Sequence, residues 1–137
     1  MPTTYRWLLL LGSNIAGPER VQQAFERLAL LGHVTPLTAI ERMPARGDLS
    51  HFYYNALTAL ACDLDRESLR AQLKRIEIEL GRVRDGSGIV AIDIDLLALH
   101  ADGRWRADPH AIEKNEFTQT PARELIAAAG ILIGERA

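Results

Sequence analysis

Two aspartates stand at alternate positions of an apolar segment, IDIDLL at residues 92–97. Successive side chains of a β-strand point to opposite faces, so Asp93 and Asp95 share one face and the aliphatic residues share the other. Two carboxylates about 6–7 Å apart along a strand repel each other unless a cation lies between them. Because Mg²⁺ prefers oxygen ligands, the pattern favours a magnesium site. The alternative is a surface strand whose acids bind nothing.

Arg82 and Arg84 precede the acidic segment and directly follow Gly81. Guanidinium groups bind phosphate oxygens well, so the other ligands of the metal are expected to be phosphates. The alternative is that both arginines are solvated charges at the end of a helix, where they complement its dipole.

Three further residues are candidates for binding. Tyr53 and Asn55 place an aromatic ring and an amide at alternate positions of another strand, a combination that suits a flat heterocycle but also occurs in ordinary strands. His110, after Pro109, is a loop histidine, a phosphate donor or a titrating group. The sequence contains no P-loop, no Cys/His cluster for zinc and no Ser-His-Asp signature.

Length and composition predict one ordinary domain over residues 1–137. The chain has 47% hydrophobic and 25% charged residues and a net charge of −2, which gives no electrostatic reason to expect nucleic acid or a membrane as a partner. Cys62 is the only cysteine, which excludes an internal disulfide and fits a reducing compartment. No apolar run approaches the length of a membrane span, so we predict a cytoplasmic protein.

The elements that must position these residues follow from the apolar pattern. It predicts strands over residues 5–11, 33–43, 52–61 and 89–99, the second with a bulge or edge position near Pro36. It also predicts helices over 18–32 and 65–81. The order βαββαβ is typical of an α+β ferredoxin-like fold, in which the helices pack on one face of an antiparallel sheet and leave the other face for function. A short hairpin at Asp102-Gly103 and a helix over 121–129 follow.

Taken together, the motifs resemble the 6-hydroxymethyl-7,8-dihydropterin pyrophosphokinase family over nearly the whole chain. Those that occur in the family's order and approximate spacing are Leu11-Gly12-Ser13-Asn14, Phe52-Tyr53-Tyr54-Asn55-Ala56, Ile76-Glu77, Gly81-Arg82-Val83-Arg84, Ile92-Asp93-Ile94-Asp95-Leu96-Leu97 and Pro109-His110. The resemblance implies ATP as co-substrate, two Mg²⁺ ions, and transfer of pyrophosphate to the hydroxymethyl group of a reduced pterin in folate synthesis.

The resemblance also implies roles for single residues. Asp93 and Asp95 would hold the metal ions, and Arg82 would act with them in catalysis. The residues that would bind ATP are Arg82, Arg84, Leu96 and His110. Those that would line the pterin pocket are Pro44, Tyr53, Asn55 and Phe117.

Three departures from the family pattern bear on catalysis. Val90 stands where the family has an arginine, three positions before the first aspartate. The loop Asp85–Gly88 is short and carries no tryptophan to cover the pterin. Glu116 replaces an arginine and is expected to repel a triphosphate. Arg104 or Arg106 could take over as a donor.

These departures leave alternatives to efficient turnover. The chain could act slowly or on a modified pterin, or it could be an inactive relative that binds a pterin without turnover. An RNA-binding ferredoxin-like sheet is a third possibility, which the net acidity and the lack of a basic aromatic strand disfavour.

Overall fold

The computed structural model describes residues 3–134. Its strands are β1 (Tyr5–Ser13), β2 (His33–Pro36), β3 (Glu41–Ala45), β4 (Asp48–Cys62), β5 (Asp93–Ala101), β6 (Arg104–Ala107) and β7 (Ile133–Gly134). Its helices are α1 (Glu19–Leu28), α2 (Arg66–Glu79), α3 (Pro109–Glu113), the 3₁₀ turn η1 (Glu116–Thr118) and α4 (Ala122–Ala129).

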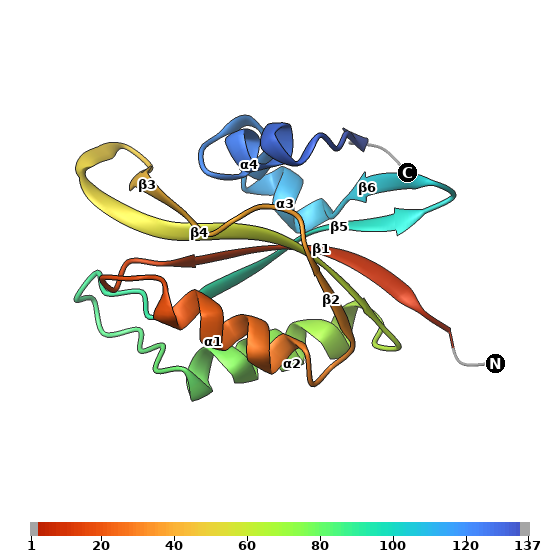
Figure 1. Ribbon diagram of the computed structural model, residues 1–137, viewed down its shortest axis with the longest axis horizontal. Helices are drawn as coiled ribbons and strands as arrows, with labels where there is room; N and C mark the ends of the chain where they lie inside the picture. Colours follow the sequence, from red (N-terminus) through yellow and green to blue (C-terminus); the bar gives the residue numbers. More distant parts are fainter. Residues whose placement is uncertain (1–2, 135–137) are drawn as a thin grey trace.

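The strands form one sheet with β1 at its centre (Figure 1). Their order is β2-β4-β1-β5-β6-β7, and β3 pairs with the first half of β4, from Asp48 to Asn55. Every pairing is antiparallel except that of β6 with β7. The α+β ferredoxin-like prediction is therefore confirmed, with the strand that carries the aspartates beside the central strand.

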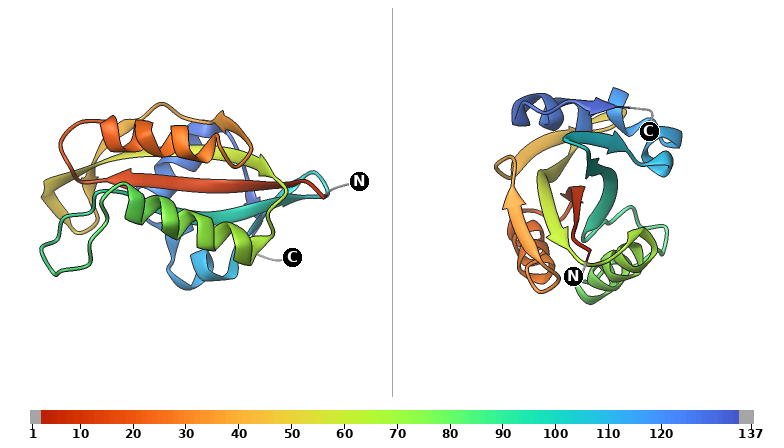
Figure 2. Two further views of the ribbon diagram at one scale, coloured as in Figure 1. Left: turned by 90° about the horizontal axis from the view of Figure 1, so that it is seen from below. Right: turned by 90° about the vertical axis from the view of Figure 1, so that its right-hand side faces the viewer.

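Helices α1 and α2 cover one face of this sheet (Figures 1 and 2). Alternation along β1 divides the core, because Trp7, Leu9 and Leu11 point towards these helices while Leu8 and Leu10 point away. Asp65 begins α2 by accepting a hydrogen bond from the backbone N–H of Ser68 at 2.9 Å, as its position predicts.

The opposite face is not entirely free, since the C-terminal segments α3, η1 and α4 lie over part of it (Figures 1 and 2). They bury a second apolar cluster that includes Leu97, Trp105 and Leu125. Position 110, for which a loop histidine was one of three alternatives, belongs to α3, which Asp108 caps. The part of this face that stays accessible is where β5 begins, at Asp93 and Asp95.

Three strand predictions were wrong in their bounds. The strand predicted over 52–61 begins earlier, at Asp48, because the β3–β4 hairpin extends its pairing. The predicted strand 33–43 is interrupted after Pro36, because the backbone N–H groups of Leu37 and Thr38 both turn to the carbonyl of Leu57. The fourth strand begins at Asp93 rather than at residue 89, because Val90 pairs with Asn14 instead of a strand neighbour. Within residues 3–134, no helix has the length and apolar character needed to cross a membrane.

Candidate active site

The strand order brings Asn55 and Asp93 to the two sides of Gly12. In the register of the sheet, Gly12 of β1 is paired with Asn55 of β4 and with Asp93 of β5. A Cβ atom at Gly12 would lie 2.7 Å from Oδ1 of Asn55. Because glycine has no side chain, the amide of Asn55 can occupy this space, beside the carboxylate of Asp93.

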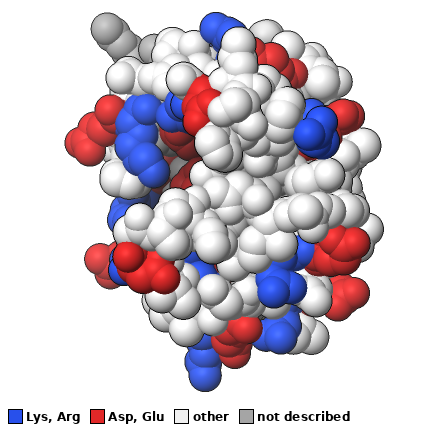
Figure 3. All heavy atoms as spheres, turned by 90° about the vertical axis from the view of Figure 1, so that its left-hand side faces the viewer, with Lys and Arg blue, Asp and Glu red and all other residues white. Residues whose placement is uncertain are grey.

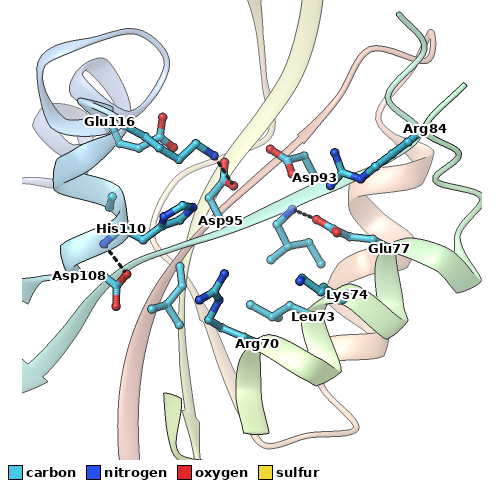
Figure 4. Close-up of a pocket in the computed structure, with 14 residues that line it drawn as sticks. Arg70, Leu73, Lys74, Glu77, Arg84, Asp93, Asp95, Asp108, His110 and Glu116 are labelled. Carbon is cyan, nitrogen blue, oxygen red and sulfur yellow. Dashed lines mark hydrogen bonds and ion pairs between the residues drawn. The ribbon is translucent and has the colours of Figure 1, made fainter. Parts of the chain in front are cut away.

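Two adjoining cavities meet at Asp93 and Asp95, which line both of them. The first cavity lies between α2, β5 and α3, and Arg70 and Lys74 of α2 belong to its wall (Figure 4). The predicted nucleotide residues that line it are Arg84, Leu96 and His110. The second cavity lies over β1 and β4, and the predicted pterin residues that line it are Pro44, Tyr53 and Asn55.

Phe117 does not join the predicted pterin residues. It lines neither cavity, and its ring packs against the apolar cluster under α4. Its neighbour Glu116 faces the cavities instead, since adjacent residues of the η1 turn point in different directions.

Asp95 carries the most perturbed carboxyl of the site. Burial, and then the charge of the neighbouring Asp93, raises the pKa of Asp95 to about 8. Glu116 adds to this effect, whereas Nζ of Lys114, 3.8 Å from Oδ1 of Asp95, opposes it. The positive charge that the chain places near Asp95 is thus too weak to stabilise its ionised form, and a bound cation would do so.

Mg²⁺ fits the donors that the chain offers here. The two carboxylates supply hard oxygen ligands on one face of β5 (Figure 4). Within residues 3–134 no group of three or more His, Cys, Asp or Glu side chains could hold a metal ion. Mg²⁺ is commonly held by one or two carboxylates, with water and substrate phosphates completing its shell, so this pair meets the requirement.

Arg82 is engaged with the backbone and with Asp93. Its guanidinium donates to the carbonyl of Ile92 at 3.0 Å and to Oδ1 of Asp93 at 3.1 Å, and its side chain is only 14% exposed. Glu77, 4.0 Å away, accepts a hydrogen bond from the N–H of Ile94 at 2.8 Å. Arg82 lines neither cavity, so in this arrangement it orients Asp93 rather than facing a phosphate.

Glu116 has a cationic partner that the sequence pattern does not reveal. Oε1 of Glu116 lies 2.6 Å from a guanidinium nitrogen of Arg46, and Nε of Arg46 donates to the carbonyl of Thr120 at 2.7 Å. The Glu116 side chain is 4% exposed. The charge expected to repel a triphosphate is therefore neutralised, and the pair ties the β3–β4 hairpin to η1. Acidic and basic side chains lie side by side around a recess at this end of the molecule (Figure 3).

Asn14 fixes the loop that leads into β5. Its side-chain amide donates to the carbonyl of Gly88 at 2.7 Å and accepts from the N–H of Val90 at 2.7 Å. The backbone N–H of Asn14 also donates to the carbonyl of Val90 at 3.0 Å. The short loop is therefore held at the end of β1, next to the site, by a residue of the motif at 11–14.

Arg104 and Arg106 lie too far away to replace a lost donor. They belong to β6, which pairs with the last residues of β5, whereas the aspartates lie at its start. At about 3.3 Å per residue, Leu99, the strand partner of Arg106, lies roughly 13 Å from Asp95, and Ala101, the partner of Arg104, lies roughly 20 Å from it. Arg106 pairs with Asp102 at 3.0 Å, and both arginines line a separate cavity.

Sequence reasoning missed four cations near the site: Arg46, Arg70, Lys74 and Lys114. A signal was present for two of them, because positions 70, 73, 74 and 77 share one face of a helix. Arg46 and Lys114 carry no comparable local signal, since hairpin and loop positions have no fixed periodicity.

The comparison with known families agrees with this arrangement. The family model for 7,8-dihydro-6-hydroxymethylpterin-pyrophosphokinase (HPPK) matches residues 8–127, which is most of the chain and includes both cavities. The chain belongs to the HPPK family. HPPK enzymes are diphosphokinases of folate biosynthesis, so the protein is an ATP-using, pterin-binding transferase. Two cavities that share a pair of carboxylates suit the two substrates of an HPPK.

Proposed function

We propose that this protein is a Mg²⁺-dependent HPPK that transfers pyrophosphate from ATP to 6-hydroxymethyl-7,8-dihydropterin or a closely related pterin. The observation that supports it most is the position of Asp93 and Asp95, which line both cavities. Group transfer between two bound substrates requires their reacting atoms to meet in one place. The carboxylate pair marks that place. The proposal treats residues 1–137 as one cytoplasmic domain, of which 1–2 and 135–137 lie outside the described residues.

In this proposal ATP occupies the first cavity and the pterin the second. Tyr53 offers a ring face to the heterocycle, and the amide of Asn55 can match its donors and acceptors. The hydroxymethyl oxygen bonds to the β-phosphorus, the bond from that phosphorus to the oxygen bridging the α-phosphate breaks, and AMP leaves with that oxygen. The hydroxyl proton is released.

The chain's residues position and neutralise the reacting groups. Asp93 and Asp95 would hold Mg²⁺, which when bound draws charge from the phosphates. Arg82 keeps Asp93 oriented through its 3.1 Å ion pair, and Arg84 and His110 face the nucleotide from opposite walls. Val90 supplies no donor here, so turnover is expected to be slow, because one missing preorganised donor can cost about 10²–10³ in rate.

The test is AMP release from ATP, Mg²⁺ and the reduced hydroxymethylpterin, measured for the unmodified chain and for Asp95→Asn. We expect the variant to release AMP at least about a hundredfold more slowly, because it loses a negatively charged metal ligand without losing volume. Asp63→Asn removes an equal charge at an exposed position outside both cavities and serves as the matched control. Equal rates for all three proteins would refute the metal-pair mechanism.

One other function has a specific observation in its favour. Val90 stands where the family has an arginine, so a donor to the transferred group is missing, which suits a relative that binds a pterin without turnover. Such a protein would bind the pterin in calorimetry, bind ATP with Mg²⁺ weakly, and release no AMP. Tight ATP–Mg²⁺ binding together with AMP release would exclude it.

A further inference from the structure

The first cavity is lined by five carboxylates, yet arginines behind it neutralise most of them. Asp108 is held by Arg66 through two hydrogen bonds of 2.6 and 3.0 Å. Glu116 is paired with Arg46 at 2.6 Å. Neither of these pairings uses a cation that lines the first cavity.

Arg82 lies behind two acids at the base of the cavity, and its single positive charge can offset one of them. It lies 3.1 Å from Asp93 and 4.0 Å from Glu77, and it is itself absent from the lining. Asp95 alone is left to Lys114 and to a metal ion. Four of the five acidic residues thus have a cationic partner of their own, and Glu77 shares Arg82 with Asp93.

Three of the four Lys and Arg side chains that line the cavity show the reverse pattern. Among residues 3–134, Arg70, Lys74 and Arg84 form no ion pair within 4.0 Å, although all three belong to the cavity wall. Arg70 and Lys74 are one helical turn apart on α2, and both lie on the side of the helix that borders the cavity (Figure 4). The cavity therefore presents uncompensated positive charge towards whatever occupies it.

We propose that Arg70 and Lys74 bind the polyphosphate chain of ATP and so take over from donors that this chain lacks at Val90 and in the loop 85–88. The proposal rests on the proposed function, because it takes ATP as the occupant of the first cavity. A polyphosphate carries the charge that three unpaired cations require, and the metal pair at Asp93 and Asp95 borders the same space. Helix α2 thus supplies a phosphate-binding wall.

The test compares ATP binding, by calorimetry with Mg²⁺, for the unmodified chain, for Arg70→Gln/Lys74→Gln and for Arg75→Gln. Arg75 lies on the same helix, is exposed and does not line the cavity, so its substitution is the matched control. We expect the double variant to bind ATP about a hundredfold more weakly, because removal of each charge-assisted hydrogen bond weakens binding roughly tenfold. Arg75→Gln should bind like the unmodified chain.

Two further measurements separate phosphate binding from a structural effect. The loss should grow from AMP to ATP and be absent for adenosine, and pterin binding without nucleotide should be unchanged. The exchange Arg70→Lys/Lys74→Arg should retain most of the affinity. If the unmodified chain binds ATP and the double variant matches Arg75→Gln, or loses adenosine as much as ATP, this proposal fails while the proposed function stands. If the unmodified chain binds no ATP, both fail.

Discussion

At the scale of single residues, Gly12 controls the space between the amide and the carboxylates. Its two strand partners are Asn55 and Asp93, and any side chain here would project into the second cavity, which Gly12 lines. A methyl group 2.7 Å from Oδ1 of Asn55 cannot be accommodated unless the amide moves.

We therefore expect Gly12→Ala to weaken pterin binding by about tenfold or more, because a displaced amide leaves polar atoms of the heterocycle unpaired. Calorimetric titration with the pterin measures the effect, and ATP binding in the first cavity should not change. In an Asn55→Ala background the penalty should shrink, as a double-mutant cycle would report. An equal penalty in both backgrounds would show that Asn55 is not the group displaced.

At the scale of elements, the loop before β5 depends on Asn14. Two side-chain hydrogen bonds of 2.7 Å tie Gly88 and Val90 to the end of β1. The loop also carries Arg84 towards the first cavity, so its anchoring affects the proposed nucleotide site.

Replacing Asn14 by Ala should release this loop. We expect faster hydrogen exchange at the amide of Val90, which loses its acceptor, and a loss of about 1–3 kcal/mol in the free energy of unfolding. Asn14→Asp keeps the acceptor for Val90 but loses the donor to Gly88, so its effect should be intermediate. Unchanged exchange at Val90 in Asn14→Ala would contradict the anchoring role. Exchange mass spectrometry and urea unfolding give the two readouts.

At the scale of the whole molecule, the burial of the Asp95 carboxyl between the sheet and the C-terminal segments makes the free energy of unfolding depend on pH. The pKa of Asp95, raised to about 8 by burial and by Asp93, exceeds the value of about 3.9 expected in the unfolded chain. The folded state therefore binds this proton more tightly than the unfolded state. The resulting contribution to stability is present below about pH 4 and is lost as the pH rises towards 8.

Metal-free protein should accordingly lose stability relative to Asp95→Asn between about pH 4 and 8, by up to about 5 kcal/mol. Urea unfolding of both proteins with a chelator at pH 5, 6.5 and 8 measures the difference. Added Mg²⁺ should restore stability at pH 8 in the unmodified chain only, because the ion binds the ionised carboxylate. A pH-independent difference between the two proteins would show that Asp95 is not perturbed.

The sequence by itself determined what depends on local periodicity and on caps. Alternation correctly predicted that Tyr53 and Asn55 lie on one face of β4 and that Asp93 and Asp95 lie on one face of β5, and Asp65 correctly marked the start of α2. These features follow from the periodic directions of side chains in strands and helices, which can be seen in a short segment of sequence.

Only the tertiary structure decided which side chains meet. The pairing of Arg46 with Glu116 joins positions 70 residues apart, and that of Arg66 with Asp108 joins positions 42 apart. Phe117 packs against the apolar cluster under α4, and Arg82 pairs with Asp93, for the same reason. Such contacts depend on strand order, register and the path of α3 to α4 over the sheet, which are properties of the packed molecule and leave no periodic trace in the chain.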